Sequence, residues 1–448
     1  MAQVIHTHAA ILGIGDELVR GQTLDTNSKL LSERLMLAGI EPVEHVTVGD
    51  DLAAMTDALR RLCARAPLVV CTGGLGPTDD DLTRDALAAV LGDELVEDAQ
   101  ALGWLTERLR SRGREVAPNQ RMQALRPRIA ECLRNDFGTA PGLFATVSNV
   151  SAAGGGASHT HTDVFCLPGP PGELKPMWDA FVVPRLRAEE GVTIRTRFLK
   201  VIGLPEAEAA ARVPGIMARD ASPQVGITAS GGVLTWRIRY RGLLDAARAD
   251  ERVEAAARRI HAAMGEHIFA DVTSGEPTLA ARIVELLKER GETLAAVESC
   301  TGGMLGQTVT AVAGSSAVFV GGFVTYSNEL KQRLVGVRGE TLAAHGAVSA
   351  ECAAEMAAGG RERTGADWCL SVTGIAGPDG GSAAKPVGTV FVGLAGPTGV
   401  RTKGFRFPGS REDVRQRSVL SALAMLYFAV VRGEQGGEPP AKLLWEVG

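Results

Sequence analysis

The most informative segment of this sequence reads Val297-Glu298-Ser299-Cys300-Thr301-Gly302-Gly303. The apolar run at residues 293–297 predicts a short buried strand, and residues 304–312 predict a helix with one apolar face. A hydroxyl group at such a turn lies at the positive end of the helix, beside main-chain N–H groups that have no partner within the helix. We therefore expect Ser299 to face a ligand. The unpaired N–H groups would be those of Gly302, Gly303 and Met304.

Two later segments also follow predicted strands and can meet this turn. One reads Tyr326-Ser327-Asn328-Glu329-Leu330-Lys331, and the other is the glycine-rich loop at residues 373–381. Lys331 falls on a short helix that Ser327 can cap. It can accept a proton from Ser299 near neutral pH if burial or a neighbouring cation lowers its pKa. Tyr326 could relay that proton or bind a developing oxyanion. The three segments together predict a site that hydrolyses acyl or amide bonds.

Cys300 is the alternative nucleophile. A thiol is intrinsically the stronger nucleophile, but an extended junction would turn Cys300 toward the core when Ser299 faces the site. In a second interpretation Ser299 and Thr301 only cap the helix and Lys331 is a solvated charge. The coincidence of three segments at strand ends favours the catalytic interpretation, with Ser299 as the nucleophile.

Composition and charge indicate a soluble protein of more than one domain. The chain has 448 residues, of which 45% are apolar and 22% charged, and its net charge of −5 provides no broad basic field for duplex nucleic acid. We find no apolar run as long as a membrane span and no signal peptide at the start, which predicts a cytoplasmic protein. The seven cysteines show no metal-binding spacing and are typical of reduced thiols.

The first part of the chain alternates apolar strands with helices. Strands are predicted at residues 9–14, 42–48 and 68–72, with helices at 27–38 and 52–64 between them. This alternation predicts a parallel sheet with helices on both faces. A ligand is then expected beyond the carboxyl ends of the strands.

The third of these strands opens onto the loop Gly73-Gly74-Leu75-Gly76-Pro77-Thr78-Asp79-Asp80-Asp81. Glycines let main-chain N–H groups approach a phosphate, and the aspartates could hold a divalent cation that bridges phosphate oxygens. The segments at residues 13–17 and 167–173 end two other strands and should line the same crevice. The aspartates could instead only cap the next helix. The convergence of three loops favours a ligand that contains pyrophosphate.

Residues 193–271 show a strand–helix–strand–strand–helix–strand order. This split β-α-β arrangement is typical of ferredoxin-like or KH-like modules. A KH module that binds nucleic acid would need a G-x-x-G clamp on a basic face, which we do not find, so a spacer or interface domain is favoured. The insert at residues 148–163, which precedes this part, predicts a surface loop. Three of its residues could gather a metal but lack a fourth ligand: His159, His161 and Asp163.

Several motifs in the last part of the chain resemble those of the C-terminal domain of CinA proteins. They lie at residues 297–303, 321–331, 346–349, 373–378 and 385–390. The first part is similar to the molybdopterin-binding MoaB and MoeA folds that form the other half of these proteins. The resemblance implies three α/β or α+β domains. They are a MoaB-like three-layer domain with a parallel sheet at residues 1–187, a small α+β domain at 193–271 and a C-terminal α/β amidohydrolase domain at 277–432.

In the C-terminal domain the resemblance implies deamidation of nicotinamide mononucleotide (NMN) to nicotinate mononucleotide and ammonia, with no cofactor. Ser299 would be the nucleophile, with Lys331 and Tyr326 as its acid/base partners. The substrate-binding groups would be Thr301, Gly302, Gly303, Thr373, Gly374, Gly377 and one of Arg411 and Arg415.

In the N-terminal domain the resemblance implies hydrolysis of the pyrophosphate of ADP-ribose with a divalent metal cation. The cation would lie at Asp80 and Asp81. The nucleotide-binding residues would be Gly15, Asp16, Asn27, Gly73, Gly74, Gly76, Thr78, Gly169 and Glu173. The family's usual Leu-Pro-Gly-Val-Pro segment reads Leu-Pro-Gly-Pro-Pro at residues 167–171, at the predicted rim of the ligand site.

The leading hypothesis is therefore a bifunctional cytoplasmic enzyme of pyridine-nucleotide salvage that acts on NMN and ADP-ribose and forms a homodimer. One alternative is a molybdopterin-binding protein whose C-terminal half has a separate role. Another is a competence- or damage-associated interaction protein with an inactive N-terminal half. Aromatic residues make up only 4% of the chain, which provides few stacking groups for single-stranded nucleic acid.

Overall fold

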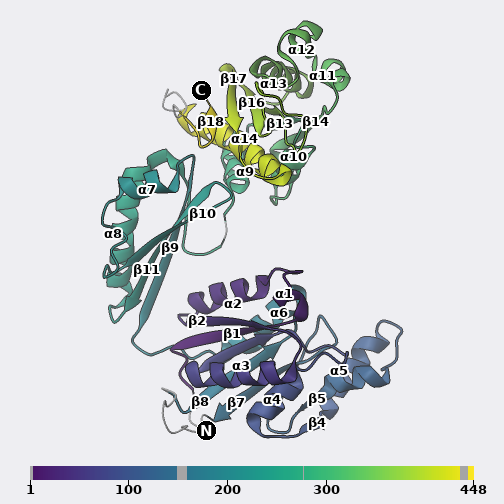
Figure 1. Ribbon diagram of the computed structural model, residues 1–448. Helices are drawn as coiled ribbons and strands as arrows, with labels where there is room; N and C mark the ends of the chain where they lie inside the picture. Colours follow the sequence, from purple (N-terminus) through teal and green to yellow (C-terminus); the bar gives the residue numbers. More distant parts are fainter. Residues whose placement is uncertain (1–3, 149–158, 276, 434–441, 448) are drawn as a thin grey trace. The chain divides into compact units, whose positions relative to one another are not determined.

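The computed structural model describes residues 4–148, 159–275, 277–433 and 442–447. The chain forms two compact units, Met1–Val192 and Thr193–Gly448 (Figure 1). The second unit contains a middle domain and a C-terminal domain, each with its own sheet. The fold class predicted from the sequence is confirmed in all three domains.

The first unit is built on a six-stranded sheet in the order β2-β1-β3-β8-β7-β6. Its parallel strands are β2 (Glu41–Val48), β1 (His8–Ile14), β3 (Leu68–Thr72) and β8 (His161–Leu167). Its antiparallel edge consists of β7 (Gly142–Ser148) and β6 (Glu131–Leu133). One face packs against α2 (Thr26–Leu37) and α6 (Pro171–Met177), and the other against α3 (Leu52–Arg65) and α4 (Thr83–Leu91).

Smaller elements complete this unit. They are α1 (Asp16–Val19), α5 (Ala99–Arg110) and the two-stranded sheet of β4 (Leu95–Glu97) and β5 (Leu125–Pro127). The predicted parallel sheet between two helical layers is therefore present. The sequence analysis did not predict the antiparallel edge.

The insert at residues 148–163 forms no metal site in the part of the chain that the structure describes. Residues 149–158, on which most of the predicted loop falls, lie outside the described residues. His161 and Asp163 belong to β8, and Asp163 is 3.1 Å from Nε2 of the buried His6 and accepts a hydrogen bond from Thr146 Oγ1 (2.7 Å). His159 Nε2 is 2.8 Å from the main-chain oxygen of Cys63. Asp163 and His159 therefore contact other groups of the protein, and the described residues show no cluster in which they meet His161 around a cation.

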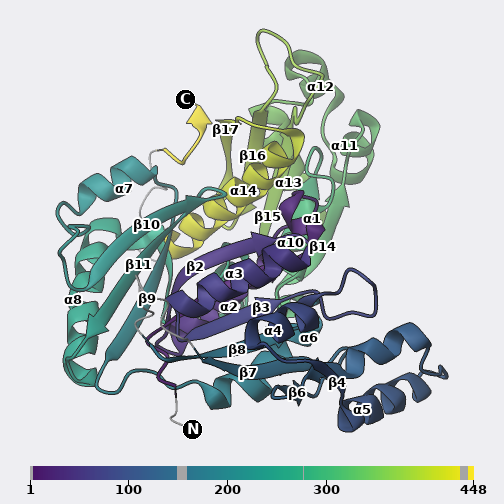
Figure 2. The same cartoon turned by 60° about the horizontal axis from the view of Figure 1, so that its bottom comes forward.

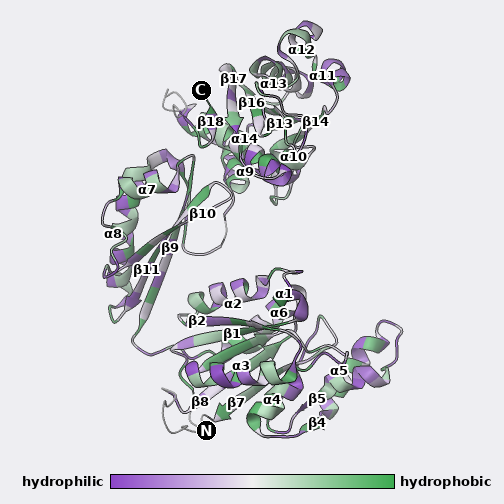
Figure 3. Ribbon diagram, in the orientation of Figure 1, coloured by the Kyte–Doolittle hydropathy of each residue, from purple (hydrophilic) through white to green (hydrophobic). Residues whose placement is uncertain are grey.

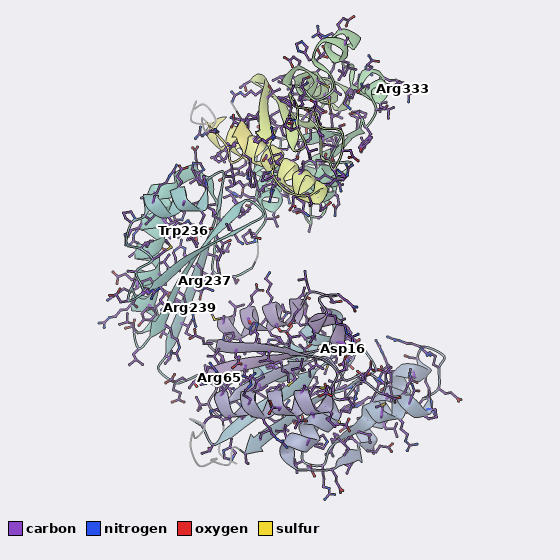
Figure 4. The ribbon with its side chains drawn as sticks, in the orientation of Figure 1. Asp16, Arg65, Trp236, Arg237, Arg239 and Arg333 are labelled. Carbon is purple, nitrogen blue, oxygen red and sulfur yellow. The ribbon has the colours of Figure 1, made fainter. Side chains whose placement is uncertain are left out.

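The middle domain is an antiparallel sheet in the order β10-β11-β9-β12. Its strands are β9 (Thr193–Ile202), β10 (Gln224–Ser230), β11 (Val233–Gly242) and β12 (Ile268–Val272). Its helices are α7 (Glu206–Arg212) and α8 (Ala246–Met264). Side chains along β11 alternate, so that Trp236 packs under the helices and Arg237 points to the opposite face (Figure 4). The order of the strands is that of the predicted split β-α-β arrangement.

The C-terminal domain has a six-stranded sheet in the order β14-β13-β15-β16-β17-β18. The parallel part consists of β14 (Phe319–Val324), β13 (Leu294–Glu298) and β15 (Trp368–Gly374). The antiparallel part consists of β16 (Thr389–Gly396), β17 (Gly399–Arg406) and β18 (Glu446–Val447). One face packs against α9 (Leu279–Arg290), α10 (Met304–Thr310) and α14 (Arg411–Gly433), and the other against α11 (Asn328–Val335), α12 (Gly339–His345) and α13 (Ala350–Thr364) (Figures 1 and 2).

Among the described residues, α14 is the one helix that is long and apolar enough to cross a membrane. Of its most apolar stretch, 67% is buried inside the protein, and its apolar side chains pack in the core of the C-terminal domain. Figure 3 shows the same concentration of apolar residues in the central strands of the sheets. The apolar character of α14 is therefore explained by its position as a core helix.

Candidate active site

Ser299 and Lys331 meet at the carboxyl end of the parallel part of the C-terminal sheet. Ser299 directly follows β13, and its Oγ lies 3.1 Å from Lys331 Nζ. Lys331 lies on α11, which begins after Ser327, and the Ser327 hydroxyl accepts a hydrogen bond from the Leu330 N–H as the sequence predicts. The side chains of Ser299 and Lys331 are both buried, with 8% and 1% of their residue surfaces exposed.

The surroundings of Lys331 favour its neutral form. Burial lowers the pKa of Lys331 below its ordinary value, and no carboxylate contacts its Nζ among the described residues. Two carbonyl oxygens, those of Thr325 (2.9 Å) and Tyr326 (3.4 Å), accept hydrogen bonds from Nζ. A neutral amine has two N–H groups and one lone pair, so the lone pair is left for the hydroxyl of Ser299. This geometry is that of a general base and its nucleophile.

The amino end of α10 is already occupied by a carboxylate. The side chain of Glu298 is buried and accepts hydrogen bonds from the N–H groups of Gly303 (3.0 Å), Leu305 (2.9 Å) and Gly306 (2.8 Å). The expectation that the turn offers free N–H groups at Gly302, Gly303 and Met304 is wrong, because the other two donate to the carbonyls of Ser299 and Thr301. A negative charge at a helix amino terminus is favourable, and here it is supplied by the protein itself.

Two hydrogen-bond donors next to Ser299 remain available to a ligand, and both belong to Thr301. Its main-chain N–H donates to no acceptor among the described residues, and its fully buried hydroxyl also has no partner there. Donors at this position are suited to bind an oxyanion, should the Ser299 hydroxyl attack a carbonyl group.

Cys300 faces away from the site. It is buried in the apolar cluster on the α9–α14 face of the sheet, and this burial raises the pKa of its thiol to about 12. The thiolate, which is the nucleophilic form, is therefore scarce at neutral pH.

Tyr326 and Arg411 form the rim of the site. The side chain of Tyr326 is exposed, and its hydroxyl accepts a hydrogen bond from Arg411 Nη2 (3.1 Å). Arg411 also donates to the carbonyl of Gly377 (2.6 Å). The Tyr326 hydroxyl is thus bound to an arginine, and its contact with Lys331 is made by the main-chain oxygen. Arg415 Nη2 instead donates to the carbonyl of Thr301 (2.9 Å) and so holds the turn that follows Ser299.

The remaining predicted substrate-binding residues shape this edge of the sheet. The Thr373 hydroxyl donates to the carbonyl of Ala347 (2.7 Å). A Cβ on Gly374 would lie 2.6 Å from Val390 Cγ2, so glycine allows the close approach of β16. Gly302 and Gly303 have φ angles of 58° and 95°, which glycine adopts without strain.

The N-terminal unit contains a pocket of about 620 Å³ at the carboxyl ends of its parallel strands. All three predicted loops line it, through Gly15, residues 73–78 and Gly169 among others. Among the described residues its lining contains no lysine or arginine. It does contain six carboxylates, those of Glu17, Asp25, Asp50, Asp80, Asp81 and Glu173. Burial and the neighbouring Asp16, Glu17 and Asp80 raise the pKa of Asp50. A polyphosphate would therefore need a cation to bind in this pocket.

Asp81 holds the glycine-rich loop in shape. It accepts hydrogen bonds from the N–H of Gly76 (2.6 Å) and from the N–H and hydroxyl of Thr78 (2.9 and 2.5 Å). These donors are thus unavailable to a phosphate, and the Asp81 oxygens are largely occupied. Asp80 is exposed and is the freer of the two carboxylates predicted to bind metal.

Most of the other residues predicted for this pocket form hydrogen bonds with neighbouring segments of the protein. Asn27 Nδ2 donates to Thr72 Oγ1 (3.0 Å) and to the carbonyl of Gly169 (2.7 Å). Glu173 accepts a hydrogen bond from Asn135 Nδ2 (2.7 Å). Asp16 lies outside the lining and accepts a hydrogen bond from the Asp50 N–H (3.4 Å). Gly73 and Gly74 adopt positive φ angles, and a Cβ on Gly73 would lie 2.3 Å from the Ile14 oxygen.

Sequence analysis missed two residues of the C-terminal site, Glu298 and Thr325. A carboxylate at the end of an otherwise apolar strand was the signal for Glu298, because a buried charge needs partners and the next helix begins six residues later. Thr325 has no comparable signal, because threonine is common in strands.

The fold and the site define a three-domain α/β protein with a pocket in its N-terminal domain and a buried serine–lysine pair in its C-terminal domain. Models of three domain families match the chain: a probable molybdopterin-binding domain at residues 10–188, the damage-inducible protein CinA KH domain at 196–270 and the CinA C-terminal domain at 276–430. The chain belongs to the CinA family.

Similar proteins match along almost the whole chain. A putative competence-damage inducible protein of Symbiobacterium thermophilum is 40% identical over 93% of this chain and 97% of its own length. A CinA-like protein of Anaeromyxobacter is 39% identical over 94% of this chain and 99% of its own length. Among solved structures, the competence/damage inducible protein CihA of Agrobacterium tumefaciens is 42% identical, covering 35% of this chain and 99% of its own, with a TM-score of 0.34.

Proposed function

We propose that the C-terminal domain hydrolyses the carboxamide of NMN. The observation that carries this proposal is the distance of 3.1 Å between Ser299 Oγ and a buried Lys331 Nζ whose other hydrogen-bond partners are carbonyl oxygens. Arg411 is the better placed of the two arginines to bind the substrate phosphate, because it is exposed, whereas Arg415 is half-buried and paired with the Glu412 carboxylate.

The proposed reaction has two stages. Lys331 takes the proton of the Ser299 hydroxyl while Oγ attacks the carboxamide carbon, and the Thr301 donors bind the oxyanion. The carbon–nitrogen bond then breaks as the Lys331 ammonium returns a proton to the nitrogen, which releases ammonia and leaves an ester on Ser299. Water, deprotonated by Lys331, hydrolyses this ester to nicotinate mononucleotide and restores the hydroxyl.

The purified full-length protein should release ammonia from NMN, and a chelator of divalent cations should leave the rate unchanged. The chemistry above requires only side chains and main-chain groups of the protein. A coupled assay of ammonia measures the rate with and without the chelator, and chromatography identifies nicotinate mononucleotide as the second product. Absence of both products, or a requirement for metal, would contradict the proposal.

We also propose, as a second activity, that the N-terminal domain hydrolyses the pyrophosphate of ADP-ribose with a divalent cation. The acidic pocket without a basic side chain favours this, because a cation must offset the repulsion between phosphates and carboxylates. Asp80 and Asp50 would hold the cation, which when bound supplies Lewis-acid stabilisation of the leaving phosphate. The alternative is a pterin ligand in the same pocket.

The homodimer and the cytoplasmic location stay predictions.

Asp80→Asn should remove divalent-dependent hydrolysis of ADP-ribose and leave ammonia release from NMN unchanged. The substitution removes one exposed carboxylate from the pocket without touching the contacts by which Asp81 holds the loop. AMP formation with and without a chelator is the measurement, and Asp179→Asn, outside the pocket lining, is the control. Normal, chelator-resistant AMP formation in the variant would contradict the assignment, and no AMP from the wild type would favour the pterin alternative.

A further inference from the structure

Thr325 lies beside the nucleophile in the sheet. Glu298 pairs with Val324 on β14 and with Val372 on β15. The ladder continues for one more residue, because the Thr325 N–H donates to the Glu298 carbonyl (2.8 Å) and the Ser299 N–H to the Val372 carbonyl (2.9 Å). Thr325, Ser299 and Thr373 therefore form one row of hydroxyl side chains across three adjacent strands. Residues of one row in a parallel sheet point to the same face.

The hydroxyl of Thr325 differs from the other hydroxyls of this face. The side chain is fully buried, and its Oγ1 has no hydrogen-bond partner in the described part of the chain. The hydroxyl of Thr373 donates to Ala347, and that of Ser371, also buried, donates to the Ala353 carbonyl (2.6 Å). A buried polar group without a partner destabilises the folded state, so it is satisfied best when a ligand supplies the missing hydrogen bond.

We propose that the Thr325 hydroxyl binds the carboxamide nitrogen of the substrate in the reaction that Ser299 begins. This inference rests on the proposed function of the C-terminal domain. A primary carboxamide has an oxygen, which needs donors, and an NH₂ group, which needs an acceptor. Thr301 supplies the donors, and Thr325 Oγ1 is an unoccupied acceptor beside Ser299.

The position of Thr325 also explains how the nitrogen receives its proton. The carbonyl oxygen of the same residue accepts a hydrogen bond from Lys331 Nζ (2.9 Å). A nitrogen held at Thr325 Oγ1 is therefore close to the ammonium group that Lys331 becomes after it deprotonates Ser299. Lys331 can then protonate the leaving nitrogen as the carbon–nitrogen bond breaks, and ammonia departs.

Thr325→Val, Thr325→Ser and Ser371→Ala in the full-length protein test this inference. Thr325→Val should lower kcat for NMN about 10- to 100-fold, the effect of leaving one buried hydrogen-bonding group of the substrate without its partner. Its Tm should equal or exceed that of the wild type, because valine keeps the shape and removes an unpaired hydroxyl. Thr325→Ser should restore most of the turnover. Ser371→Ala, the matched control, should lower Tm and leave kcat unchanged, because its hydroxyl already has a partner.

The outcomes separate this inference from the function on which it rests. If the wild type releases ammonia and Thr325→Val has a normal kcat and KM, the inference is overturned and the proposed function stands. A fall of both Tm and kcat in Thr325→Val would assign the residue to packing and would also overturn it. Thr325→Ser as slow as Thr325→Val would do the same. Absence of ammonia release from the wild type would overturn the proposed function and the inference together.

Discussion

Ser299→Ala should lower ammonia release from NMN by about 10⁴-fold or more, because among the described residues no other hydroxyl or thiol is hydrogen-bonded to the Lys331 amine. The fold should survive, since the contact that places the turn is made by the Ser299 main chain, whose N–H donates to Val372. Turnover by the purified variant, with thermal unfolding measured in parallel, gives both results.

Cys300→Ala is the matched control for this substitution. The Cys300 thiol lies in the apolar core with its pKa raised to about 12, so its removal should lower stability and preserve turnover. The reverse pattern, with Ser299→Ala active and Cys300→Ala inactive, would make the thiol the nucleophile.

Lys331→Met should lower the rate of deamidation by about 10²- to 10⁴-fold, the usual effect of losing a general base. Methionine is similar in length and apolar, so it can occupy the buried position without the cost of burying an ionisable amine. We therefore expect the variant to unfold at a temperature no lower than the wild type. A variant with near-normal turnover would show that Lys331 is not the base.

The pH dependence of the reaction gives a second measure of Lys331. The reaction needs the neutral amine, so the rate should rise with pH as Lys331 loses its proton and should level off above its pKa. Burial places that pKa below the ordinary value of 10.5. The profile of kcat/KM in the wild type should show this ionisation, and any residual rate of the methionine variant should lack it. A wild-type rate that falls through this range would contradict the role.

The sequence predicted the elements of the C-terminal site well, because each has a strong local signal. An apolar strand followed by small residues and a helix located Ser299, and the Ser327 cap located the helix of Lys331. Both signals are short-range, and the packing of parallel strands then brings their carboxyl ends together.

What the sequence could not predict depends on contacts between distant segments. The Glu298 carboxylate turns back to the amino end of α10, which changes the available donors of the turn. The Tyr326 hydroxyl is bound by Arg411, which lies 85 residues away in the chain. The antiparallel edge of the N-terminal sheet also depends on long-range pairing, between β7 and β8. No local pattern encodes these contacts.

The carboxylate of Glu298 at the start of α10 also affects the orientation that a nucleotide would take in the C-terminal site. A helix amino terminus is a common binding site for a phosphate, but a terminus that already carries a negative charge repels a phosphate. The phosphate would then lie at the outer, arginine-bearing edge, with the pyridine ring innermost. The buried Glu298 carboxylate therefore disfavours an anion at the inner end of the site and favours one beside Arg411.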